Sequence, residues 1–238
     1  MAKKKNSIRK ELFSSRSQGV DRILIFRFFK LLHGRFWGFG FIISGILGAT
    51  IGYIIRPDLF DIGIPLSELG TDVRTAPFFA GSMFFAAYSL WRWRTYLKNT
   101  LKNSRPVIPL VSLTILGLYL IALMPVTWEI WPHRIHNAGV ILAGLSMSAT
   151  VLMDSVLSKN RKNKNEEIWK IIKLFSFTLI ISGGIIVILS LEDVGKLNLI
   201  LLGEFMMFAG YSIWILLKIF LGEGSRSAIG KLFHKLVG

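Results

Sequence analysis

Cysteine is absent from this chain of 238 residues, and acidic residues are scarce. Without cysteine, the chain has no disulfide framework, no cysteine-ligated metal and no thiol nucleophile. Charged residues make up only 18% of the chain and hydrophobic residues 52%, which excludes a soluble enzyme domain. Only 14 Asp and Glu oppose 29 Lys and Arg, so the formal net charge is +15. A chain that is both hydrophobic and basic is typical of a polytopic membrane protein beside an anionic leaflet.

Six apolar runs are long enough to cross a membrane, which takes about 20 mainly apolar residues. They cover residues 36–55, 76–91, 107–128, 137–157, 171–191 and 197–217. The sequence therefore predicts an all-α fold, a polytopic membrane protein built as a bundle of six transmembrane helices.

The basic residues fall on alternate sides of these runs. Twenty-five of the 29 lie in residues 1–35, 92–105, 159–173 and 218–238. The four on the other side are Arg56, Arg74, Arg134 and Lys196. Because Lys and Arg collect in cytoplasmic loops, both termini of a multi-pass protein of the cell membrane should be cytoplasmic.

Three parts of the chain follow from this pattern. Residues 1–35 form a basic cytoplasmic segment with a weakly amphipathic stretch, and residues 36–220 form the transmembrane domain. Residues 221–238 form an amphipathic helix with an apolar face made by Ile229, Leu232, Phe233, Leu236 and Val237. Both flanking helices should lie on the anionic inner leaflet, either as anchors or as lipid sensors. The basic run 159–167 is interpreted in the same way, so no nucleic-acid partner is expected.

Two acidic residues lie within apolar runs. Glu204 is seven residues into the sixth run, at a depth where an ionisable group usually faces a cavity or a partner. It is either a functional proton carrier or polar ligand, or a structural residue that bonds to a neighbouring helix or reaches the outer interface. Asp154, near Lys159, is interpreted as an interfacial carboxylate. Gly48, Gly52, Gly183, Gly203 and Gly210 predict close helix packing within the bundle.

Two outer loops carry the other polar candidates. The first, near residues 56–77, contains Ser67, Glu68 and Arg74, and the third contains His133 and His136. We expect the Ser67 turn to fold over the outer mouth of the bundle and to meet the start of the fourth helix. His136 would then occupy the first turn of that helix, paired with Glu68 or with its competitor Glu129, and Arg74 or Arg134 would suit a phosphate. The two histidines lack a third ligand, so neither a metal nor another cofactor is expected.

At these loops the chain resembles the DUF-nine-nine-eight family of prokaryotic six-helix membrane proteins. The resembling residues are Ser67, Glu68, Leu69 and Gly70, then Gly117, Met124 and Pro125, with His136 or His133 as the following histidine. Met124 stands where the family usually has Phe. The family is distantly similar in fold to eukaryotic six-helix proteins of autophagy modulation and GPI-lipid remodelling. The resemblance implies a scaffold rather than an activity.

The expected function is therefore that of a non-enzymatic membrane protein. Its outward-facing polar pocket, lined by Ser67, Glu68, Arg74 and His136, would bind a lipid headgroup or an amphiphile, or the protein would assist a partner membrane protein. One alternative is a lipid hydrolase or transferase at the outer leaflet, with His136 as its base. A second is a proton-coupled transporter that uses Glu204.

Overall fold

The computed structural model describes residues 34–100, 106–124, 130–157, 166–191 and 198–221. These residues are helical apart from turns and short connections, which confirms the all-α prediction for this part of the chain. The α-helices are α3 (Trp37–Ile55), α4 (Ala76–Thr100), α5 (Ile108–Leu123), α6 (Ile130–Leu157), α7 (Glu166–Leu191) and α8 (Ile200–Leu221). Three short 3₁₀ helices are η1 (Gly34–Phe36), η2 (Pro57–Leu59) and η3 (Leu66–Gly70). The amphipathic segments predicted at either end of the chain lie outside the described residues, apart from their innermost positions.

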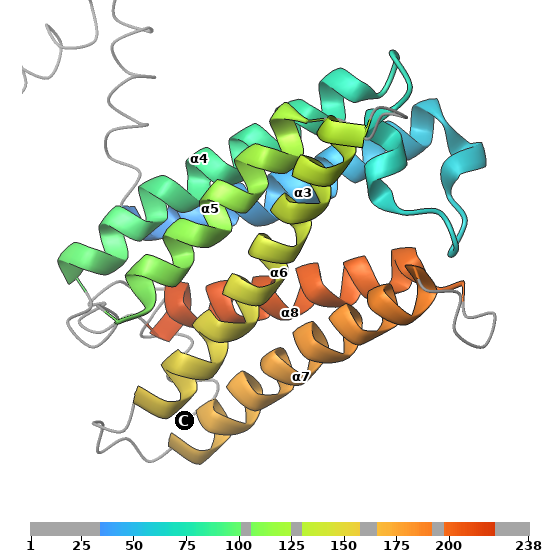
Figure 1. The fold of residues 1–238 in the computed structure, drawn as a ribbon. Coiled ribbons are helices and arrows are strands. Elements are labelled where there is room, and N and C mark those ends of the chain that lie inside the picture. Colours follow the sequence, from blue (N-terminus) through green and yellow to red (C-terminus); the bar gives the residue numbers. More distant parts are fainter. Residues whose placement is uncertain (1–33, 101–105, 125–129, 158–165, 192–197, 222–238) are drawn as a thin grey trace, which may run out of the picture. The chain divides into compact units, whose positions relative to one another are not determined.

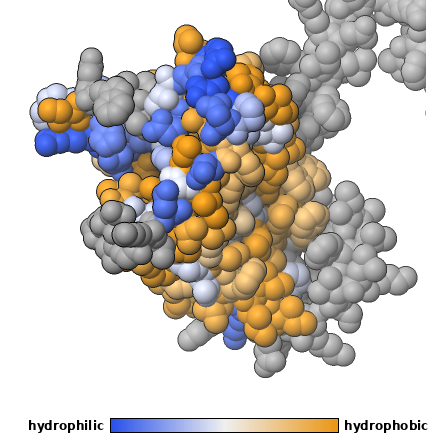
Figure 2. Space-filling model, turned by 90° about the vertical axis from the view of Figure 1, so that its right-hand side faces the viewer, coloured by the Kyte–Doolittle hydropathy of each residue, from blue (hydrophilic) through white to orange (hydrophobic). Residues whose placement is uncertain are grey.

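Four of the described helices are long and apolar enough to cross a membrane: α3, α6, α7 and α8. Helix α5 is apolar but has only 16 residues, and the apolar part of α4 is followed by Arg92 and Arg94. Many large apolar side chains lie on the surface, among them Ile54, Leu145 and Leu191. A surface of this kind suits contact with lipid better than contact with water. Figure 2 shows apolar side chains covering much of one face, beside a cluster of hydrophilic ones.

The start of α6 differs from the sequence prediction. The helix begins at Ile130 and not near residue 137, and Pro132 falls in its first turn, where proline is tolerated. His136 consequently lies in the second turn of α6. The prediction that His136 occupies a helix N-terminus suited to an anion was therefore wrong.

Helices that are adjacent in sequence, α6 and α7 among them, pack against each other, and α6 also contacts α8 (Figure 1). The predicted role of the glycines in packing is confirmed. A Cβ on Gly203 would lie 2.6 Å from the carbonyl oxygen of Gly183, and a Cβ on Gly48 would lie 2.4 Å from Cβ of Ser82. The backbones of α7 and α8 approach this closely because both contact positions are glycine.

Candidate functional site

The α3–α4 loop, residues 56–75, is held against the helices by buried contacts. Leu69 is buried, and its side chain fills the space beside Gly52 of α3. The hydroxyl of Thr75 donates a hydrogen bond to the carbonyl oxygen of Leu69 at 2.6 Å. The backbone N–H of Leu201, in the first turn of α8, donates to the carbonyl oxygen of Ile62 at 3.0 Å. The loop therefore has a defined position over the ends of α3 and α8.

Ion pairs also hold the α3–α4 loop together. Arg56 donates to Asp58 at 2.8 Å and also pairs with Asp72, and Arg74 pairs with Asp72 at 2.9 Å. The hydrogen bond from Arg74, together with that from Arg56, holds the pKa of Asp72 well below its ordinary value. The hydrogen bond from Arg56 likewise lowers the pKa of Asp58. Both aspartates are consequently charged at neutral pH, and both arginines are engaged within the loop.

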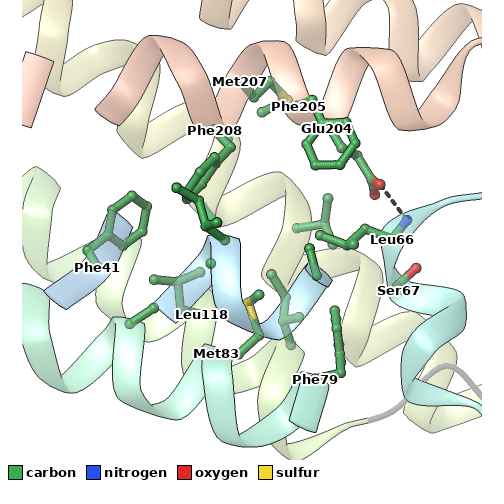
Figure 3. A pocket seen from close by; sticks show the side chains of 18 of the residues that line it. Phe41, Leu66, Ser67, Phe79, Met83, Leu118, Glu204, Phe205, Met207 and Phe208 are labelled. Atoms are coloured by element: carbon green, nitrogen blue, oxygen red, sulfur yellow. Dashed lines mark hydrogen bonds between the residues drawn. The ribbon is translucent and has the colours of Figure 1, made fainter. Parts of the chain in front are cut away.

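Glu204 joins this loop to α8. Its carboxyl oxygen Oε2 accepts a hydrogen bond of 2.6 Å from the backbone N–H of Leu66, which lies 138 residues earlier (Figure 3). Leu66 opens η3, and the first N–H groups of a helix have no partner within the helix. The carboxyl group satisfies one of these donors. The hydrogen-bonded role considered for Glu204 is therefore observed, but its partner is a loop amide and not another helix.

Beside this contact lies a cavity of about 390 Å³. Its walls come from α3, α4, α5, α6, α8 and the α3–α4 loop. The polar side chains that line it belong to Thr50, Tyr53, Ser67, His136 and Glu204. No lysine or arginine of the described residues lines it, and the rest of the lining is apolar or aromatic apart from glycine. The cavity can thus hold a molecule that is mainly apolar.

Four of the five polar side chains that line the cavity share one end of it. His136 and Glu204 lie in the second turns of α6 and α8, and Tyr53 lies in the last turn of α3. These helix ends are on the side of the α3–α4 loop, which contributes Ser67. Figure 3 shows Glu204 and Ser67 at one end and Phe41 at the other. The cavity therefore has a polar end and an apolar end.

Two buried polar atoms that belong to the lining residues have no hydrogen-bond partner in the described structure. His136 is only 2% exposed, and its Nδ1 lies 2.8 Å from the carbonyl oxygen of Met124. Because a carbonyl can only accept, Nδ1 carries a proton, and Nε2 of the neutral ring is an acceptor. Neither His136 Nε2 nor the hydroxyl of Tyr53 has a partner. Buried polar atoms are normally paired, so two residues of the cavity lining each carry an unsatisfied polar atom.

The structure brings together three of the residues singled out from the sequence. Ser67, His136 and Glu204 line one cavity, whereas Glu68 and Arg74 do not. Glu68 accepts a 3.3 Å hydrogen bond from the hydroxyl of Thr71 and does not contact His136. Arg134 lies over the ring of Trp131, with its guanidinium carbon 5.8 Å from the ring centroid, so no predicted phosphate-binding arginine reaches the cavity.

Sequence reasoning missed Tyr53 and the environment of Asp154. A tyrosine at the end of an apolar run is common at membrane interfaces, so Tyr53 gave no distinct signal. Asp154, interpreted from the sequence as an interfacial carboxylate, is buried between helices and only 2% exposed. Its carboxylate contacts Lys173 at 2.9 Å and Lys218 at 2.5 Å, and it accepts a hydrogen bond from the indole of Trp214 at 3.1 Å.

Comparison of the chain with family models, curated proteins and solved structures finds no match. The functional argument therefore depends on the cavity and on its residues.

Proposed function

We propose that this chain is a membrane protein that binds an amphiphile in its interior cavity. The observation that carries the proposal is the division of the cavity: the unpartnered Nε2 of His136 and hydroxyl of Tyr53 belong to its polar end, and the remainder is apolar. An amphiphile has the same division, with a head that forms hydrogen bonds and a tail that needs apolar surroundings. The volume is near the lower end of the range of about 300–1,000 Å³ for ligand pockets, which suits a molecule with one chain.

The exposure of the lining residues indicates how the ligand enters. Ile46 of α3 is 53% exposed and Phe205 of α8 is 36% exposed, whereas Phe79 and His136 are buried. The cavity therefore opens on the side of α3 and α8. This side carries the exposed apolar residues expected to face lipid, so the ligand would come from the bilayer and not from water.

The topology completes the proposal. All six described helices would cross the cell membrane, with both termini in the cytoplasm and the α3–α4 loop outside. The basic segments would contact the anionic inner leaflet. The exposed apolar faces would suit contact with a partner membrane protein. The four apolar helices and the distribution of Lys and Arg support this orientation. Membership of the DUF-nine-nine-eight family, suggested by the short loop motifs, is part of the same proposal.

The two catalytic or transport alternatives have less support. A hydrolase would need a base that is oriented by another group and a nucleophile within reach. The carbonyl of Met124 orients His136, but no hydrogen bond joins His136 to Ser67, and Glu68 is engaged elsewhere. A proton-coupled transporter would need a change of access around Glu204, whose hydrogen bond to Leu66 instead holds the loop in place.

Native mass spectrometry of the full chain, purified in a mild uncharged detergent, tests the binding of an amphiphile. The wild type should retain one small molecule. Ala49→Phe adds a ring within the cavity lining and should abolish retention. Ile54→Phe is the matched control on the same helix, because Ile54 is exposed and does not line the cavity. Retention of the same molecule by Ala49→Phe, or a wild type that releases none, would contradict the proposal.

A further inference from the structure

Glu204 carries the only acidic group among the described residues that line the cavity, and no lysine or arginine is among them. Of its two oxygens, one accepts the N–H of Leu66, and the structure gives the carboxyl group no other hydrogen bond or ion pair among the described residues. A carboxylate can accept about four hydrogen bonds, so most of its capacity is available. A carboxylate in low-dielectric surroundings is stable when it is paired with a cation. Among the described residues, such cations are supplied to Asp154 but not to Glu204.

Aromatic rings line the cavity, that of Phe41 at its apolar end and that of Phe205 beside Glu204 (Figure 3). Those that line the cavity belong to Phe41, Tyr53, Phe60, Phe79, Phe205 and Phe208. The rings of Tyr53 and Phe60 pack edge to face with centroids 5.0 Å apart, and Phe205 follows Glu204 directly in α8. The face of an aromatic ring attracts an organic cation, most strongly where water is excluded.

The remaining polar atoms favour the same kind of head. His136 Nε2 is an acceptor, and the hydroxyl of Tyr53 can accept as well as donate. An ammonium group has several N–H donors and no acceptor, so it matches two acceptors and a carboxylate. An anionic head would face Glu204 without a nearby arginine, since Arg74 is paired with Asp72 outside the cavity.

We propose that the cavity is selective for a lipophilic organic cation, an amphiphile with a single hydrocarbon chain and an ammonium head placed beside Glu204. The proposal rests on the proposed function, because it specifies the charge of the amphiphile that the cavity binds. It departs from the phosphate-headed ligand expected from the sequence, since the arginines that would bind a phosphate do not reach the cavity.

Three probes with one chain length separate the possibilities: decylamine, decanol and decanoate. Calorimetric titration of each into the full chain, in an uncharged detergent at neutral pH, should rank decylamine first. Its affinity should exceed that of decanoate at least tenfold, with decanol between them. Equal or tighter binding of decanoate would overturn the proposal, and this ranking requires no variant.

Glu204→Gln removes the charge but keeps a side-chain oxygen that can accept the N–H of Leu66. The variant should bind decylamine at least tenfold more weakly than the wild type and decanol equally well. Glu68→Gln, the same substitution on the loop but outside the cavity, should leave both affinities unchanged. Unchanged decylamine binding by Glu204→Gln would overturn the proposal. If the wild type binds decanol but binds decylamine no more tightly than decanoate, the selectivity for a cation is refuted and the binding of amphiphiles is not. A wild type that binds none of the three probes refutes amphiphile binding altogether.

Discussion

The carboxyl groups of Asp154 and Glu204 lie in opposite electrostatic surroundings. Asp154 contacts two lysine ammonium groups and an indole N–H where α6, α7 and α8 meet. Glu204 contacts a single backbone amide and otherwise lines a cavity. Because the charge of Asp154 is balanced within the protein, its role is structural. Glu204 has no such balance among the described residues, so its remaining capacity is available to a ligand.

Asp154→Asn tests the structural role. The substitution removes the charge that both Lys173 and Lys218 contact, and loss of one member of a buried ion pair costs about 3–5 kcal/mol. We expect unfolding of the purified variant in detergent to occur at a correspondingly lower denaturant concentration. Glu68→Gln, which also removes one carboxylate, should change stability by less than about 0.5 kcal/mol. Equal stability of the two variants would show that Asp154 does not hold the three helices together.

The candidate site was partly visible in the sequence. Glu204 attracted notice because an acid within an apolar run is rare. Its partner could not be predicted, since the N–H of Leu66 is a backbone group present at almost every residue. The expected pairing of Glu68 with His136 came from motif positions alone. The end of α5 instead presents the Met124 carbonyl to His136, and no sequence pattern identifies such a contact.

The ion pairs of the α3–α4 loop predict a pH dependence. Because Arg74 and Arg56 lower the pKa of Asp72 below its ordinary 3.8, these pairs stabilise the folded loop above that pH. The contribution should disappear as the pH falls through the lowered pKa. Hydrogen exchange at loop amides should be faster in Asp72→Asn than in the wild type at pH 6, and the difference should shrink only in strong acid. No difference at pH 6 would refute the stabilising role of these pairs.

Each described α-helix corresponds to one of the apolar runs in the sequence, because a run of about 20 apolar residues is typical of a helix that spans a membrane. Their boundaries were less predictable. The polar residues before position 137 have the composition of a loop. In the structure, Pro132 and its neighbours instead form the first turn of α6. This extension places His136 below the helix end, within the cavity wall. Helix contacts made through glycine were anticipated from spacing, but the partner of each glycine was not.

Gly203→Ala tests the contact between α7 and α8. The added methyl group would lie 2.6 Å from the carbonyl oxygen of Gly183, so the two helices must separate. Overpacking of this kind costs about 1–3 kcal/mol. Gly81→Ala is the matched control, because a Cβ at Gly81 has nothing within 4 Å. We expect a lower melting temperature for Gly203→Ala and an unchanged or higher one for Gly81→Ala. The reverse order would contradict the observed packing.

For the whole molecule, the structure joins a cavity with a polar end to an apolar surface suited to lipid. The α3–α4 loop closes the polar end and is held by Glu204 and by the contact between Leu201 and Ile62. If the chain has the proposed topology, this end lies at the outer leaflet, opposite the basic segments. An amphiphile in the cavity would then have its head toward the outside.

Reporter fusions test this orientation. Fusions after Lys98, Lys162 and Gly238 should report the cytoplasm, and fusions after Leu66, Ile130 and Val194 should report the outside. The expectation follows from the 25 basic residues on one side against four on the other. A clear reversal at any one position would refute the six-span topology.

Photo-crosslinking tests most directly whether an amphiphile occupies the cavity with its head toward the loop. The probe is decylamine with a diazirine at the end of its chain, activated on the full-length protein and mapped by peptide mass spectrometry. We expect the label at the apolar end of the cavity, on Phe41, Met147 or Phe208, and its loss in Ala49→Phe. A label confined to exposed apolar residues outside the cavity, such as Ile54 and Leu191, and unchanged in Ala49→Phe, would contradict the account.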